Sequence, residues 1–153
     1  MKKLLIIAAI AFGFLSTSNA QKVEYKVITS VESIVPMGIG RSRIIEEKDP
    51  IEAENFTTER TDGKKSKQKA VKRKDAKVNL FSETKLLNFY SIAGINFQNI
   101  ASNDALLSSK INKLTSEGWE LAFVSSGVES DSGKGDGKGI FITRYIFKKT
   151  SKI

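Results

Sequence analysis

The sequence contains no cysteine and no histidine among its 153 residues. Without a thiol or an imidazole, the chain cannot perform thiol catalysis, form a Ser-His-Asp triad or build the usual zinc and copper sites. It also lacks a disulfide framework, so its stability must come from the burial of apolar side chains. The carboxylates show no spacing typical of a general acid–base pair or a hard-cation site. We therefore expect a non-enzymatic protein with no catalytic residues, no cofactor and no metal.

Long apolar runs are equally scarce, and the main one lies at the N-terminus. Residues 4–15 follow the basic start Met1-Lys2-Lys3 and precede small and polar residues that end at Ala20. This layout is typical of a secretory signal peptide, and the run is shorter than the roughly 18–20 residues that cross a bilayer. We predict a signal peptide over residues 1–20, cleavage before Gln21 and export to the periplasm or outside the cell. No transmembrane segment is expected, and the absence of cysteine predicts that there is no lipid anchor.

Positive charge is concentrated in one part of the remaining chain, which we expect to form a single α+β domain over residues 21–153. That region has 23 basic and 17 acidic residues. Residues 59–77 alone contain nine basic and three acidic residues, so they carry the whole excess of six positive charges. Because residues 50–80 are also poor in apolar side chains, they are predicted to be a mobile, basic insertion.

The basic residues suggest two kinds of contact. An exposed run of lysines can bind an anionic polymer through charge alone, although a solvated loop without a ligand has the same composition. A short segment with two glycines and two arginines, residues 38–43, is a second candidate for anion binding, with a plain turn as the alternative. The candidate anion or partner contacts are Arg41, Arg43, Lys64, Lys65, Lys67, Lys69, Lys72, Arg73 and Lys74.

Alternating apolar residues predict a strand near each end of the domain. In Lys22–Val35 one face of the strand is formed by Val23, Tyr25, Val27, Thr29 and Val31. In Gly139–Lys148 one face is formed by Phe141, Thr143, Tyr145 and Phe147, and the other by Ile140, Ile142 and Ile146. Two apolar faces predict a central strand, or a strand with one face covered by a partner. Arg144 interrupts the isoleucine face, which indicates a position at the sheet margin or a pairing with an acidic group.

A helix is predicted over Asn103–Glu117, because Leu107, Ile111 and Leu114 recur at helical spacing. Its candidate N-caps are Ser102, Asn103 and Asp104. Gly118 is expected to end it in a Schellman motif, with Trp119 returning to contact Leu114. Trp119 would then begin a strand that has Trp119, Leu121 and Phe123 on one face. A core role for Trp119 is expected, with ligand stacking as the alternative.

Weaker patterns predict the remaining elements. Arg41–Glu47 is expected to form a strand, and so is Leu86–Ile92, although its period also suits a helix. Gly94–Ile100 is expected to be a structured loop. Glu129–Lys138 reads as a hairpin loop, since its glycines lack the spacing of a phosphate-binding loop and strands are predicted on both sides.

Three stretches resemble a small bacterial family, domain of unknown function 4177: Glu24–Val27, Leu114–Glu120 and Tyr145–Lys149. The resemblance covers Val23–Val35 and about Asn103–Lys149. Two further stretches, Val35–Arg43 and Ser126–Ser130, are similar to a longer exported variant found in Bacteroidetes-type bacteria. The resemblance implies a compact α+β fold and carries no established activity. The basic insertion departs from this pattern, so the family implies no role for it.

Together these patterns predict an α+β fold, with an antiparallel sheet of three to five strands and one main helix packed on one face. The expected function is that of an exported, non-enzymatic envelope protein that binds another envelope protein or assembles with itself. The alternative is a binder of anionic envelope polymers through residues 59–77.

Overall fold

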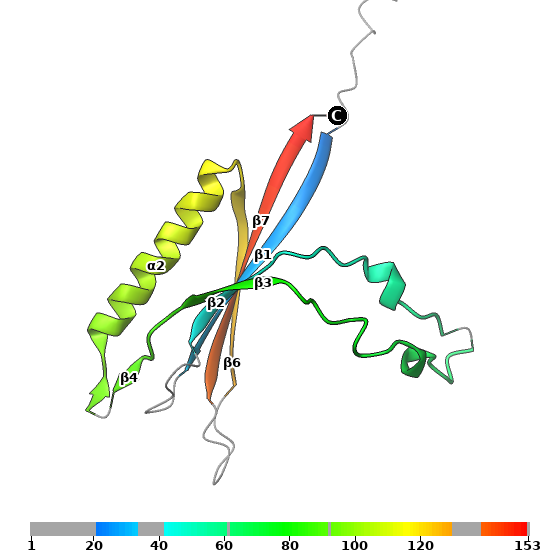
Figure 1. Ribbon diagram of the computed structural model, residues 1–153, viewed down its shortest axis with the longest axis horizontal. Helices are drawn as coiled ribbons and strands as arrows, with labels where there is room; N and C mark the ends of the chain where they lie inside the picture. The colour runs from blue at the N-terminus through cyan, green and yellow to red at the C-terminus, as the bar shows by residue number, and fades with distance from the viewer. Residues whose placement is uncertain (1–20, 34–41, 61, 92, 130–138, 153) are drawn as a thin grey trace, which may run out of the picture.

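A computed structural model describes residues 21–33, 42–60, 62–91, 93–129 and 139–152. Five antiparallel strands form the main sheet in the order β3-β2-β1-β7-β6, and the long helix α2 lies along one side of it (Figure 1). The strands are β1 (Gln21–Ser33), β2 (Arg43–Glu47), β3 (Phe81–Lys85), β6 (Glu120–Glu129) and β7 (Ile140–Lys152). This architecture confirms the predicted α+β fold.

The two longest strands form the centre of the sheet. β1 and β7 pair along their whole length, from Gln21 opposite Lys152 to Ser33 opposite Ile140. The predicted strands near the two ends of the domain are therefore confirmed, and β7 continues four residues beyond Lys148. Since β7 has β1 on one side and β6 on the other, Arg144 lies on an inner strand. The predicted position of Arg144 at the sheet margin is wrong.

Helix α2 (Phe97–Ser116) begins six residues earlier than predicted. Asn96 is its N-cap, and its side-chain oxygen accepts a hydrogen bond from the backbone N–H of Asn99 at 3.1 Å. Residues 97–102 have weak apolar periodicity, so the capping side chain determines the start of the helix. The candidate caps Ser102, Asn103 and Asp104 lie inside the helix, and most of the predicted loop at residues 94–100 is its first turn.

The predicted end of the helix is confirmed. Gly118 adopts a φ of +86°, a conformation that glycine reaches without steric cost. The N–H of Trp119 donates to the carbonyl of Leu114 at 3.0 Å, and the N–H of Gly118 donates to Thr115 at 3.0 Å. These two bonds are those of a Schellman motif, which turns the chain directly from α2 into β6.

The strand predicted at residues 86–92 is confirmed only at Tyr90–Ser91, and residues 86–89 belong to no strand. The longer strand is β3, which ends at Lys85, and the chain then enters a small second sheet made of β4 (Tyr90–Ser91) and β5 (Gly94–Ile95). β3 alternates between exposed and half-buried positions with the sequence Phe-Ser-Glu-Thr-Lys. The apolar content of residues 86–92 therefore misplaced the strand, because the strand at the edge of the sheet is the more polar segment, Phe81–Lys85, directly before it.

The hydrophobic core lies between α2 and the sheet. Its buried side chains are Ile28, Ile44, Leu86, Leu114 and Phe147, with Leu107, Ile111, Trp119 and Tyr145 packed against them. Both ends of the helical apolar stripe predicted from the sequence therefore reach the core. Within the described residues, no helix is long and apolar enough to cross a membrane.

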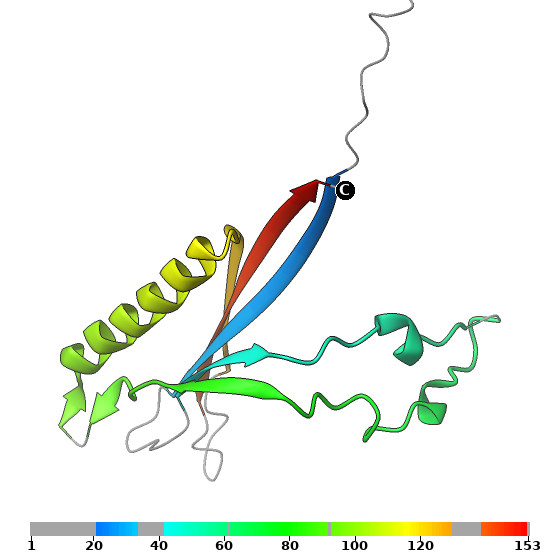
Figure 2. The same ribbon diagram turned by 45° about the horizontal axis from the view of Figure 1, so that its top comes forward.

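Residues 48–80, which we call the basic arm, connect β2 to β3. The arm contains two short 3-10 helices, η1 (Ala53–Phe56) and η2 (Gln68–Ala70). Its base is closed by a hydrogen bond from the N–H of Lys48 to the carbonyl of Leu80 at 3.0 Å, and the rest extends away from the sheet (Figures 1 and 2). The predicted signal peptide, the turn at residues 38–41 and the hairpin loop at residues 130–138 lie outside the described residues.

Candidate functional site

The sheet has a second face, opposite to α2, that carries exposed apolar side chains. Cross-strand register places Val27 opposite Ile146. Both side chains point away from α2, to the side of the sheet opposite to the core residues Ile28 and Phe147. Tyr25 on this side is 67% exposed and Phe123 is 62% exposed. We call this surface the open face; it comprises Val23, Tyr25, Val27, Thr29, Val31, Ile45, Phe123, Ile142, Arg144 and Ile146.

The alternation predicted for β1 is confirmed, but the side buried under α2 is the more polar one. Ile28 and Ser30 are buried, whereas Val23, Tyr25 and Val27 on the opposite side are all exposed. One helix can cover only one face of a sheet, and β7 directs Phe147 and Tyr145 toward α2. The apolar set of β1 is therefore left on the open face.

A β-bulge brings Phe123 onto the open face. In β6 Leu121 lies opposite Phe147, but the register shifts before Phe123, which lies opposite Ile146. A bulge inserts one extra residue and reverses the side on which the following residues point. The prediction that Trp119, Leu121 and Phe123 share a face is therefore wrong for Phe123, which joins Tyr25 and Val27 on the other side.

Arg144 provides positive charge within this apolar surface. It lies opposite Thr29 of β1 and Ser125 of β6, and its side chain is exposed. No carboxylate among the described residues forms an ion pair with it. Large aromatic side chains and arginine are the residues that most often carry binding energy in protein interfaces. The open face combines Tyr25, Phe123 and Arg144 in this way.

At the edge of the open face the charges are paired. Arg43 contacts Glu83 at 2.7 Å, and Lys148 contacts Glu120 at 3.4 Å. Arg43 also lines a shallow hollow of about 280 Å³ together with Ser42, Glu83 and Lys85. A carboxylate at the same hollow weakens its attraction for an anion. Arg41, the other arginine of the predicted anion site, lies outside the described residues.

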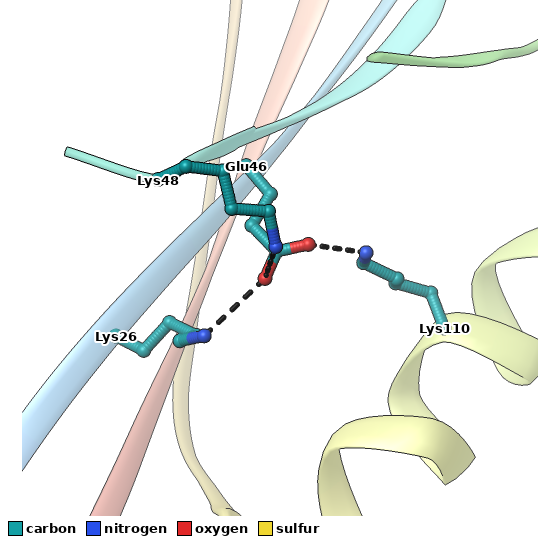
Figure 3. Close-up of polar contacts among 4 residues, drawn as sticks. All are labelled: Lys26, Glu46, Lys48 and Lys110. Atoms are coloured by element: carbon teal, nitrogen blue, oxygen red, sulfur yellow. Dashed lines mark hydrogen bonds and ion pairs between the residues drawn. The ribbon is translucent and has the colours of Figure 1, made fainter. Parts of the chain in front are cut away.

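The side of the sheet under α2 holds a buried carboxylate surrounded by lysines. The side chain of Glu46 is 4% exposed, and its oxygens contact Lys26 at 3.3 Å, Lys48 at 2.9 Å and Lys110 of α2 (Figure 3). Burial disfavours the ionised form, but the three lysine hydrogen bonds outweigh this effect and lower the pKa of Glu46 to about 2. The carboxylate is therefore ionised at neutral pH and joins β1, β2 and α2.

Trp119 lies on the same side of the sheet as Glu46, and both residues contact Lys26. It packs against the core, and the ammonium groups of Lys26 and Lys149 lie 5.2 and 5.8 Å from the centre of its ring. These are cation–π distances. Lys149 also donates to the carbonyl of Glu117 at 2.7 Å, at the end of α2. Trp119 is thus half-buried and packs against the core cluster, in agreement with the structural role that was predicted for it, and both ammonium groups near its ring belong to the protein itself.

The basic arm presents its charge without acidic partners. All nine basic side chains of residues 59–77 are exposed, and none forms an ion pair with another described residue. The carboxylate of Asp62 instead accepts hydrogen bonds from the backbone N–H groups of Lys64 and Lys65, which lower its pKa. The candidate contacts Lys64, Lys65, Lys67, Lys69, Lys72, Arg73 and Lys74 therefore lie together on the arm, apart from Arg43.

The open face was missed as a site by the sequence prediction. The signal was present in the two apolar faces of β7 and in the alternation of β1. The two apolar faces predicted either a central strand or a strand with one face covered by a partner. The sequence of a strand does not show which of its faces a helix will cover, so the choice stayed open. Among the described residues, no three acidic side chains are grouped so as to hold a metal ion.

Comparison with protein-family models, with curated proteins and with solved structures gives no match to this chain. The resemblance to domain of unknown function 4177 therefore stays a prediction.

Proposed function

We propose that this protein is a non-enzymatic, exported binding module that docks an envelope protein through the open face. The observation that carries this proposal is the exposure of Tyr25 and Phe123, at 67% and 62%, on the side of the sheet opposite to α2. Exposed apolar patches on small domains mark interaction sites, because the apolar surface remains in water until a partner covers it.

The size of the open face suits such a role. The open face spans four strands about 4.8 Å apart. With about eight residues of each of the three long strands and five of β2, at about 3.3 Å per residue, its surface is roughly 450 Å². A typical protein interface buries about 800 Å² on each partner. The open face is therefore large enough for the apolar centre of a small interface, with the charged residues at its edge supplying the rim.

The charges of the open face define the partner that fits it best. An apolar surface would cover Tyr25, Val27 and Ile146, and a carboxylate opposite Arg144 would pair with its guanidinium. A buried arginine without such a carboxylate would disfavour binding. We therefore expect a protein partner that presents an apolar patch with an acidic residue near its centre.

Two matched variants test the docking surface. Tyr25→Ser removes an exposed aromatic ring from the open face, and Phe97→Ser removes one that is 76% exposed at the start of α2. Both mature variants are used as bait in chemical cross-linking to envelope extract, followed by quantitative mass spectrometry. We expect Tyr25→Ser to lose the proteins that wild type and Phe97→Ser both retain. Retention of the same proteins by all three would refute docking at the open face.

Binding of anionic envelope polymers through the basic arm is a second candidate function. It is favoured by the nine exposed cations of residues 59–77, which have no ion pairs within the described chain. Binding to polyphosphate should weaken steeply with added salt, because it depends on charge. Deleting Gly63–Lys77 should abolish it and leave the thermal melt nearly unchanged, while Lys22→Gln with Lys113→Gln should have little effect. Undiminished binding by the deletion variant would exclude the arm as the site.

A further inference from the structure

The outer strand β6 has one feature that protects an exposed sheet edge, the bulge between Leu121 and Phe123, but it lacks charged residues and proline along its centre. Its central stretch, Leu121–Val128, contains no charged residue and no proline, and every residue in it is exposed. β6 pairs only with β7, so its other side has no strand partner among the described residues. Natural edges are commonly shortened, charged or interrupted by proline, because an unpaired edge recruits another strand.

The opposite edge of the same sheet is protected. β3 has five residues, against ten in β6, and it carries Glu83 and Lys85. Glu83 is held by Arg43 at 2.7 Å, and β3 leads directly out of the basic arm. The two edges therefore differ in length and charge, and β6 is the edge suited to pairing.

Apolar side chains are bare on both sides of β6. Val124 and Val128 lie opposite Tyr145 and Phe141, on the side that carries α2, yet they are 43% and 60% exposed. Phe123 is 62% exposed on the open face. A strand added beside β6 would pair its backbone and cover Val124 and Val128 on the α2 side, while Phe123 would remain on the open face.

We propose that a second copy of this chain occupies the edge, with the two β6 strands antiparallel in one ten-stranded sheet. Directly opposite residues of antiparallel strands share a face. A two-fold axis at Ser126 satisfies this rule, because it places Val124 of each copy opposite Val128 of the other. The uncharged stretch then brings no like charges together, and the protected β3 edges end the assembly at two copies.

The dimer would also extend the open face. Pairing at β6 brings Phe123 of each copy to the middle of the joined sheet and aligns both open faces on the same side. The binding surface for a third protein is thereby roughly doubled in width. The pairing itself does not depend on the proposed docking function, because Val124 and Val128 lie on the side of the sheet opposite to the open face.

Cysteine cross-linking gives a direct test, since the chain has no cysteine of its own. In the proposed register the two copies of residue 126 lie directly opposite each other, with Cα atoms about 4.5–5.5 Å apart. This separation suits a disulfide. Mature Ser126→Cys should form a disulfide dimer under mild oxidation at micromolar concentration, and Thr115→Cys, an exposed position on α2, should not. Absence of the cross-link in Ser126→Cys would refute the register.

Charge complementation tests the same interface without oxidation. Sedimentation velocity should show a concentration-dependent dimer for wild type and for Tyr25→Ser. Val124→Glu with Val128→Glu, and Val124→Lys with Val128→Lys, should each be monomeric and show wild-type circular dichroism. An equimolar mixture of the two should recover the dimer, because glutamate then faces lysine across the axis.

Three results would overturn the proposal. They are a wild-type chain that is monomeric at every concentration, charged variants that stay dimeric, and a mixture that fails to recover the dimer. A dimer lost in Tyr25→Ser but kept in the charged variants would instead place the contact on the open face. Loss of partner capture by Tyr25→Ser in a chain that remains dimeric would separate docking from pairing.

Discussion

Glu46 is expected to be the charge on which the stability of this domain depends most. Its carboxylate is 4% exposed and contacts ammonium groups from three places in the chain, Lys26, Lys48 and Lys110. Replacing it with glutamine keeps the size of the side chain but removes its charge. Three ammonium groups would then be held together without a counter-charge, and the junction between α2 and the sheet should weaken.

The magnitude follows from the pKa of Glu46. Burial raises this pKa, but the hydrogen bonds from Lys110, Lys48 and Lys26 outweigh it, so that the pKa falls from 4.5 to about 2. Each pKa unit corresponds to about 1.4 kcal/mol, which gives about 3 kcal/mol of folding free energy at neutral pH. Since Lys48 is 42% exposed, solvent screening reduces its share. We expect Glu46→Gln to cost about 2 kcal/mol.

The pH dependence distinguishes this effect from a packing defect. Because the folded pKa is lowered, the contribution of Glu46 is complete above its unfolded pKa and is lost as the pH falls from 4.5 to about 2. Urea denaturation should therefore show the largest difference between wild type and Glu46→Gln near neutral pH, and almost none at the acid end.

The control is Glu83→Gln, which breaks an exposed ion pair with Arg43. The side chain of Glu83 is 43% exposed, so this change should cost less than about 1 kcal/mol. An equal loss in both variants, or a loss in Glu46→Gln that is the same at every pH, would refute the reasoning from buried charge.

Three further substitutions test the junctions around α2 by chemical denaturation. Trp119→Ala should cost about 3 kcal/mol, because the ring packs on the core; a variant as stable as wild type would show that Trp119 has another role. Gly118→Ala should cost about 1 kcal/mol, since alanine is strained at a φ of +86°, and no change would contradict the Schellman stop. Asn103→Ala should cost about 2 kcal/mol, because its buried amide bonds both backbone groups of Leu87 and the carboxylate of Glu32; a loss below about 0.5 kcal/mol would show that these bonds are replaced by water.

Features set by neighbouring residues were predictable from the sequence. The helix stop at Gly118 and Trp119 depends on hydrogen bonds that span six residues, and glycine identifies the position that needs a positive φ. The long strands β1 and β7 were predictable because alternation persists over many residues. The start of α2 was not, since Asn96 caps a first turn that has little apolar periodicity of its own.

Features set by distant pairing were not predictable. The junction of Glu46 with Lys26 and Lys110 joins residues 20 and 64 positions apart, and no local pattern marks them. The basic residues of the arm were predictable from the sequence, because a dense run of like charges stays in solvent whichever residues lie near it in the fold. The open face required knowledge of how many helices cover the sheet and which strand neighbours which.

The bulge in β6 connects the fold to both proposed interactions. If β6 paired with β7 in regular alternation and without a bulge, Ala122 would lie opposite Ile146 and Phe123 would point toward α2 with Leu121. The open face would then lose one of its two most exposed aromatic rings. The same shift aligns Val124 and Val128 on the α2 side, where a two-fold pairing at Ser126 sets them against each other. The bulge therefore sets which side each group occupies: Phe123 lies on the open face, where a protein partner would cover it, and the two valines lie on the α2 side, where a second copy would cover them. Deleting Ala122 should remove the bulge and leave Phe123 opposite Ile146, so partner capture and dimer formation should both persist, whereas Tyr25→Ser impairs docking alone.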